Sequence, residues 1–145
     1  MPRCQGAILR DDHILLIQHR EHTGGRNYWL LPGGGQEEGE TEEQCVVREM
    51  KEETGLDVKV ERLLMEMPEL PGSIHRRKTY LCSVVAGEAR PGYEPEPEAS
   101  AIYSIVEVSW FDLRDETAWG EQVKLDPYTY PELTRVQALL GYSQE

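Results

Sequence analysis

The sequence predicts one α/β domain, a three-layer α/β/α sandwich around a mixed sheet. Short apolar runs of strand type alternate with two segments of helical type, an order that is typical of sheets covered by helices on both faces. The 145 residues suit a single domain over 1–145, and a hydrophobic content of 39% excludes a disordered chain.

The first third of the chain reads as strands that lead into a glycine turn. Apolar alternation predicts two strands joined by Asp11-Asp12, and a polar loop with Gly24-Gly25 follows. A short strand then enters a tight turn with no side chains beyond Pro32, where the backbone can approach a ligand closely. The predicted ranges are Cys4 to Leu9, Ile14 to His19, Glu21 to Asn27 (loop), Trp29 to Leu31 and Pro32 to Gly35 (turn).

A helix is predicted from about Glu42 to Thr54. Thr41 is a good N-cap, and Gln44 three positions later completes a capping box. Gly55 supplies the left-handed position that commonly ends a helix. The apolar positions Val46, Val47 and Met50 are expected to pack against the core.

This helix gathers acidic side chains. Residues 34 to 56 hold eight glutamates, and Glu49, Glu52 and Glu53 share one helix face. Carboxylates at such close range disfavour each other's ionisation unless a cation neutralises them. A divalent metal site is therefore predicted, with Arg48 orienting or partly neutralising a carboxylate, and the glycines favour a phosphate-bearing ligand. A solvated acidic helix would not explain the glycine turn, the cap and the spacing together.

The remaining elements continue the alternation. Strands are predicted near 57–66, 78–87 and 105–111, with an exposed loop rich in Pro and Glu over 88–100. A C-terminal helix is predicted to start with Pro131 in its first position, to run to Leu140 and to end at Gly141.

The glycine turn and the acidic helix together resemble the Nudix box. The pattern is Gly, five residues, Glu, seven residues, Arg-Glu, an apolar residue, any residue, Glu-Glu, any residue, Gly and an apolar residue. It is met over residues 34–56 by Gly34, Glu40, Arg48, Glu49, Met50, Glu52, Glu53, Gly55 and Leu56. The residues before the box and the strand ending in Trp110-Phe111 also look like those of this family. In its length, the chain resembles the small MutT-like members.

The resemblance implies the same sandwich fold and the hydrolysis of a phosphoanhydride bond in a nucleoside diphosphate linked to another group. Glu49 and Glu53 would then bind Mg²⁺ or Mn²⁺, with Glu52 as a third ligand and the carbonyl of Gly34 as a fourth. The base that activates water would be Glu49 or Glu52, with Arg48 beside them. Some family members place the general base on a late loop, and the corresponding loop here contains Glu94, Glu96 and Glu98. Of these three, we take Glu98 as a candidate metal ligand.

Several residues outside the box are candidates for substrate binding. The basic run Arg76-Arg77-Lys78 can receive polyphosphate oxygens or, alternatively, protect an edge strand. Arg20 and Arg26 are weaker candidates of the same kind. Trp29 can stack on a base, as can Tyr28 and Tyr80, although aromatic residues near a sheet commonly belong to the core.

The substrate itself is left open by the sequence. The short length favours a nucleoside triphosphate pyrophosphohydrolase. Pro71, fifteen residues after Leu56, resembles the ADP-ribose pyrophosphatases, so an ADP-ribose or nucleotide-sugar pyrophosphatase is the alternative. A nucleotide-binding sensor without catalysis is the alternative of another class, although such domains tend to lose the box carboxylates, and this chain keeps them.

Composition limits the classes of ligand and partner that the chain is expected to bind. A net charge of −12 argues against binding of long nucleic acid, but a small nucleotide can bind through a metal ion. No apolar stretch reaches the roughly 18 residues of a membrane span. Three widely spaced cysteines suit a reduced, cytoplasmic protein. A homodimer is possible by analogy with the family.

Overall fold

The first two strands form the predicted hairpin. The computed structural model describes residues 2–69, 72–93 and 97–142. β1 (Arg3–Arg10) and β2 (His13–Glu21) are antiparallel and meet at the turn, where Leu9 lies opposite Ile14. Asp11 and Asp12 both have positive φ, of 51° and 65°. Two such residues give the turn twist that matches paired strands, and Asp tolerates this conformation better than most residues do.

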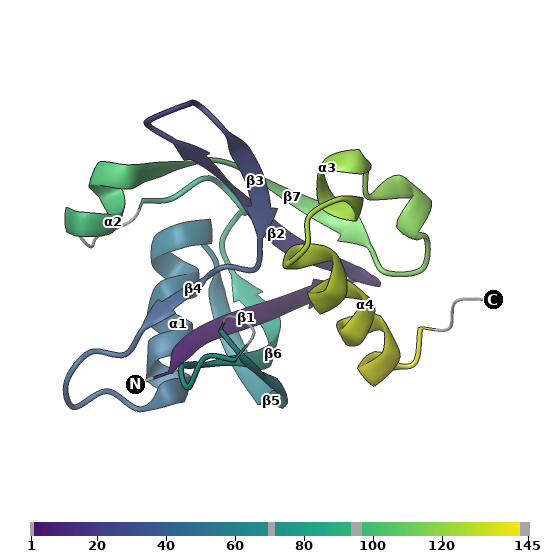
Figure 1. Ribbon diagram of the computed structural model, residues 1–145. Helices are drawn as coiled ribbons and strands as arrows, with labels where there is room; N and C mark the ends of the chain where they lie inside the picture. Colours follow the sequence, from purple (N-terminus) through teal and green to yellow (C-terminus); the bar gives the residue numbers. More distant parts are fainter. Residues whose placement is uncertain (1, 70–71, 94–96, 143–145) are drawn as a thin grey trace.

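A mixed sheet of seven strands is built on this hairpin within the described residues (Figure 1). Its main path runs β3-β2-β1-β6-β5; β4 pairs with β1, and β7 pairs with β2. β1 and β6 are parallel, and the other pairs are antiparallel. The remaining strands are β3 (Asn27–Leu30), β4 (Gly33–Gly35), β5 (Asp57–Pro68), β6 (Arg76–Ala86) and β7 (Tyr103–Asp112).

The acidic helix has the predicted limits. α1 (Glu42–Thr54) begins at the capping box of Thr41 and Gln44 and ends at Gly55, whose φ is 77°. Its buried face packs with Cys4 and Ile8 of β1 and joins one of two core clusters. Val46 and Met50 belong to this face, but Val47 is 40% exposed, so its predicted place in the core was wrong. Glu49 and Glu53 are buried instead, at 1% exposure each.

The opposite face of the sheet carries the second core cluster and α4 (Thr129–Leu140), so the sandwich has the three predicted layers (Figure 1). The helix ends at Gly141 (φ 84°), as predicted, but it starts two residues before Pro131. Asp126 Oδ1 accepts hydrogen bonds from the backbone N–H of Tyr128 and Thr129, at 2.8 and 2.9 Å, and this interaction organises the earlier start.

Part of the segment predicted as an exposed loop over 88–100 is hydrogen-bonded to the end of α1. The backbone N–H groups of Arg90, Gly92 and Tyr93 donate to the carbonyls of Thr54, Glu53 and Glu52 at 2.9, 2.9 and 3.1 Å. These bonds satisfy carbonyls that the end of a helix leaves without partners. The segment ends in a short helix, α2 (Pro97–Ile102), which the sequence analysis missed.

Two further short elements precede α4 and were also missed: η1, a 3₁₀ turn (Glu116–Ala118), and α3 (Glu121–Lys124). None of the helices in the described ranges combines the length and the apolar character needed to cross a bilayer.

Candidate active site

The glycines before α1 form a strand rather than a flexible turn. Gly33 and Gly34 pair with Gln5 and Cys4 as part of β4, which lies between β1 and α1 (Figure 1). A Cβ on Gly34 would lie 2.5 Å from Glu49 Oε1, and one on Gly33 would lie 2.4 Å from the carbonyl oxygen of Cys4. Glycine is therefore required by close approach to a carboxylate and to a neighbouring strand, and neither residue needs a positive φ.

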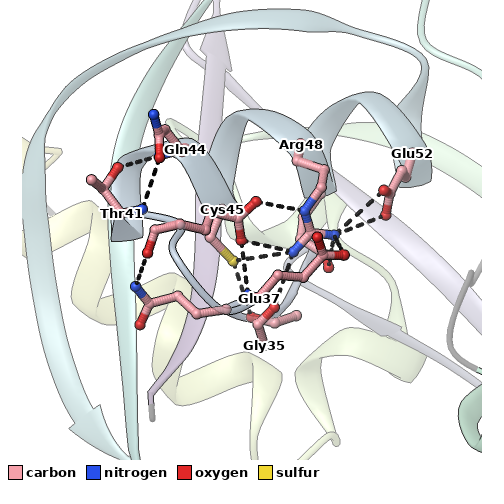
Figure 2. A network of polar contacts seen from close by, with 11 residues as sticks. Gly35, Glu37, Thr41, Gln44, Cys45, Arg48 and Glu52 are labelled. Atoms are coloured by element: carbon pink, nitrogen blue, oxygen red, sulfur yellow. Dashed lines mark hydrogen bonds and ion pairs between the residues drawn. The ribbon is translucent and has the colours of Figure 1, made fainter.

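The Arg48 side chain compensates the carboxylates of the box (Figure 2). Its Nε donates to Glu40 Oε2 at 2.7 Å, its Nη1 to Glu49 Oε1 at 2.9 Å, and Nη1 also lies 3.3 Å from Glu52 Oε2. Its Nη2 donates to the Gly35 carbonyl at 3.1 Å, which ties α1 to β4. With Glu37 at 3.7 Å, the guanidinium thus lies among four glutamates, and its hydrogen bond lowers the pKa of Glu40 to about 2.

Glu53 is held from a different direction. Its Oε1 accepts a hydrogen bond from the backbone N–H of Gly33 at 2.7 Å. Glu49 and Glu53 are both 1% exposed, whereas 17% of the Glu52 side chain is exposed. The three glutamates that the sequence places on one helix face are therefore held by different donors: Arg48 for Glu49 and Glu52, and the strand backbone for Glu53.

A cavity of about 390 Å³ opens beside Glu49. It is lined by residues of the box, of α2 and of the first positions of β1 and β7. Glu98 lines it, so the structure brings this candidate to the same space as Glu49 and Gly34. Glu94 and Glu96 lie outside the described residues. The described lining is Arg3, Gly34, Gly35, Glu49, Glu98, Ala99, Ile102 and Tyr103.

The donor set suits a hard divalent cation in its chemistry. Carboxylates and a backbone carbonyl are the oxygen ligands that Mg²⁺ and Mn²⁺ prefer, and Gly34 leaves space for the Glu49 carboxylate. In the part of the chain that the structure describes, no group of three or more His, Cys, Asp or Glu side chains is already gathered as for a metal ion. Arg48 holds Glu49 and Glu52 in its own contacts instead.

The predicted basic run lies within the sheet and is paired. β6 lies between β1 and β5, so the alternative that these residues protect an edge strand was wrong. Arg76 lies 3.4 Å from Glu66, Arg77 lies 3.4 Å from Glu132, and Lys78 lies 2.9 Å from Glu42. None of the three lines the cavity beside Glu49, as far as its described residues go.

Of the two other predicted cations, Arg20 lies in β2 and Arg26 lies in the loop that leads to β3. Arg20 donates to the Asn27 side chain at 3.1 Å, and Arg26 pairs with Glu21 at 3.2 Å. Arg26 also covers the ring of Tyr28, 5.1 Å from its centroid, and lines a separate cavity of about 410 Å³ next to α3.

The aromatic candidates have packing roles. Trp29 packs edge-on against Phe111, with ring centroids 5.2 Å apart, beside the core under α4. The Tyr80 side chain is 7% exposed, and its hydroxyl donates to Glu42.

Two residues that line the cavity were missed by sequence reasoning: Arg3 and Tyr103. The ring of Tyr103 stacks on the buried His19, with centroids 4.1 Å apart and an interplanar angle of 18°. Arg3 is the first residue of β1 and Tyr103 the first residue of β7, and no motif distinguishes either residue. Only the pairing of β1 with β4 and of β2 with β7 brings them to the box.

Comparison with known proteins shows which proteins the chain resembles. The curated relatives include the NAD-capped RNA hydrolase NudC of Photobacterium profundum, 39% identical over 94 residues, which cover 64% of this chain and 34% of that protein. The ADP-ribose pyrophosphatase of Methanocaldococcus jannaschii is 36% identical over 113 residues, or 76% of this chain and 60% of that protein. The chain spans about a third of the length of the first curated relatives that it matches.

Solved structures share the fold. The crystal structure of an ADP-ribose pyrophosphatase from Streptococcus suis has a TM-score of 0.66 at 27% identity and covers 99% of this chain and 92% of that one. A NUDIX hydrolase from Nitrosomonas europaea has a TM-score of 0.70 at 24% identity and covers 100% and 97% of the two chains. The sequence model of the NUDIX domain matches residues 2–132, and the chain therefore belongs to the NUDIX family.

Proposed function

We propose that the protein hydrolyses a phosphoanhydride bond in a nucleoside diphosphate linked to another group, with the help of a divalent cation. Membership of the NUDIX family supports the reaction type. The observation that carries the proposal is the position of Glu49, which is buried against Gly34 and faces a cavity that Glu98 also lines. A carboxylate kept at the wall of a cavity by a glycine-specific contact is suited to bind a ligand there.

We assign the cation to Mg²⁺, with Mn²⁺ as its substitute. The residues that would hold it are Glu49, Glu52, Glu53, Glu98 and the Gly34 carbonyl. When bound, the cation would neutralise charge on the phosphate oxygens and position the attacking water. Because Arg48 now holds two of these glutamates, loading requires its side chain to share or release Glu49 and Glu52.

The chain's own residues would then orient the reaction. Arg48 lowers the pKa of Glu40 and holds Glu49 and Glu52 through its contacts, and the Gly33 N–H fixes Glu53. A carboxylate must accept the proton of the attacking water, and Glu49, Glu52 and Glu98 are the candidates. Comparing the pH profiles of kcat for the three Glu→Gln variants would identify this base, because its loss removes the acidic limb of the profile.

The substrate is a small nucleotide derivative in this proposal. Two of the relatives described above are named as ADP-ribose pyrophosphatases, so ADP-ribose is favoured over the nucleoside triphosphates that the short chain suggested. The net charge of −12 also favours a small ligand over a long nucleic acid. The cytoplasmic location and the homodimer remain predictions.

The test is product release from a panel of ADP-ribose, nucleotide sugars, dinucleoside polyphosphates and nucleoside triphosphates, each with Mg²⁺ and with Mn²⁺. Glu53→Gln is the loss-of-function variant. Glu43→Gln is its matched control, because Glu43 is an exposed residue of the same helix. Metal-dependent turnover of one substrate class, lost in Glu53→Gln and kept in Glu43→Gln, would support the proposal. No turnover with nucleotide still bound in calorimetry would favour the sensor instead.

A further inference from the structure

The cavity beside Glu49 contains a cation that sequence reasoning did not select. Arg3 lines it together with Glu49 and Glu98 and is the one basic side chain among its described lining residues. Arg76, Arg77 and Lys78, which the sequence favoured, each lie within 3.4 Å of a carboxylate. No carboxylate oxygen of the described residues forms an ion pair with Arg3 within 4 Å. Its charge therefore remains available to an anionic ligand in a way that theirs does not.

The two hydrogen bonds that Arg3 makes within the described structure go to uncharged acceptors. Its Nε donates to Gln5 Oε1 at 3.2 Å, and its Nη2 lies 3.5 Å from the carbonyl oxygen of Leu31. A guanidinium has five N–H donors in a planar fork. These two contacts orient the fork and leave the Nη1 edge for a ligand.

The orientation of Gln5 is itself determined from the far side. Its Nε2 donates one hydrogen bond to Thr79 Oγ1 at 3.0 Å and the other to Glu132 Oε2 at 2.9 Å. Both N–H groups of the amide are thereby used, so its oxygen must point toward Arg3. Gln5 is 2% exposed, Thr79 1% and Glu132 3%, so water does not compete for these bonds. An amide that is fixed in one orientation holds a flexible arginine at low entropic cost.

We propose that Arg3 binds a phosphate group of the substrate in this cavity, and that Gln5 is a positioning residue for it. The inference rests on the proposed function, because the ligand is the diphosphate that the cation and the box glutamates would hold. A guanidinium matches phosphate oxygens in a two-pronged geometry that a lysine cannot copy. Arg3 would therefore act on substrate binding, and the glutamates on the chemical step.

The test compares Arg3→Met, Arg3→Lys and Gln5→Leu with Arg10→Met, a control at the other end of the same strand, where Arg10 covers Trp110. Binding of α,β-methylene-ADP with Mg²⁺ is measured by calorimetry, and KM and kcat by ADP-ribose turnover. One or two charge-assisted hydrogen bonds correspond to roughly a 10- to 100-fold loss of affinity. We expect that loss in Kd and KM for Arg3→Met, less for Arg3→Lys and Gln5→Leu, kcat within about threefold, and no effect of Arg10→Met.

A rescue experiment separates binding from a structural role. Methylguanidinium added to an Arg3→Ala variant should recover part of the lost affinity, which a collapsed strand would not allow. Unchanged Kd and KM in a folded Arg3→Met variant would overturn the inference while leaving the hydrolase intact. Absence of turnover in the wild type would instead count against the proposed function, and the calorimetric comparison would still test Arg3.

Discussion

Two clusters of buried polar side chains lie on opposite faces of the sheet and are compensated in different ways. On the α1 side, Glu49 is 1% exposed and pairs with Arg48 at 2.9 Å beside an open cavity. On the α4 side, Glu132 is 3% exposed, accepts from the Gln5 amide at 2.9 Å and lies 3.4 Å from Arg77. Burial raises the pKa of Glu132, with Arg77 only partly opposing it.

The difference shows what burial alone does not reveal about a carboxylate. Where a guanidinium lies close and a cavity adjoins, the carboxylate has an ion-pair partner and borders a space that a ligand can enter. Where an amide is the nearest donor and the surroundings are enclosed, the carboxyl group costs free energy as an anion and serves to orient its neighbours.

The largest expected effect comes from removing the cation of the first cluster. Arg48→Met would leave Glu49 buried without its ion partner, and breaking a buried pair on one side costs about 3–5 kcal/mol of stability. We expect the urea midpoint to fall accordingly and turnover to be lost. Arg48→Lys, measured in parallel, should recover part of the stability only, because an ammonium cannot span Glu40 and Glu49 together. A midpoint unchanged in Arg48→Met would end the distinction between the clusters.

Isosteric removal of one charge in each cluster is the next test. Glu49→Gln should lower kcat by about 100-fold or more, because a ligand of the proposed cation is lost. Glu132→Gln should keep activity and stability close to the wild type, since an amide oxygen can still accept from Gln5. Steady-state kinetics and urea unfolding of both variants decide the matter. Equal kinetic effects of the two substitutions would contradict the comparison.

The smallest expected effect is that the contributions of Glu40 and Glu132 to stability depend on pH with opposite signs. The pKa of Glu40 is lowered to about 2 by Arg48, so its contribution is present above the usual value near 4.5 and is lost as pH falls toward 2. The pKa of Glu132 is raised, so protonation favours the folded state and stability is gained as pH falls toward 4.5. The free energy of unfolding of Glu40→Gln and of Glu132→Gln is measured against that of the wild type at pH 7, 4.5 and 3. The two differences from the wild type should change in opposite directions as the pH falls. Stability differences that change in the same direction for both variants would contradict the proposed difference between the two carboxyl groups.

The local structure of the box was predictable, whereas its surroundings were not. The capping box and Gly55 defined α1 to the residue, because caps act over a few neighbouring positions. The metal-ligand roles of the box glutamates and of Glu98 stay predictions. The ion pairs of Arg77 and Lys78 depend on residues far along the chain, Glu132 and Glu42, so sequence reasoning could not recognise that their charges were already used. Arg3 reaches the cavity through strand pairing, which no local pattern records.

Because residues 90–93 are hydrogen-bonded to the end of α1, three of their backbone amides can report on local opening of the box helix. The N–H groups of Arg90, Gly92 and Tyr93 are bound to the carbonyls of Thr54, Glu53 and Glu52, next to the side chains of the box. A Cβ on Gly92 would lie 1.8 Å from the carbonyl oxygen of Glu52, so this attachment tolerates no larger residue. Their exchange with deuterated solvent therefore follows local opening at the end of the box helix. Slower exchange on addition of cation or nucleotide would reveal ligand binding in a protein that is not turning over.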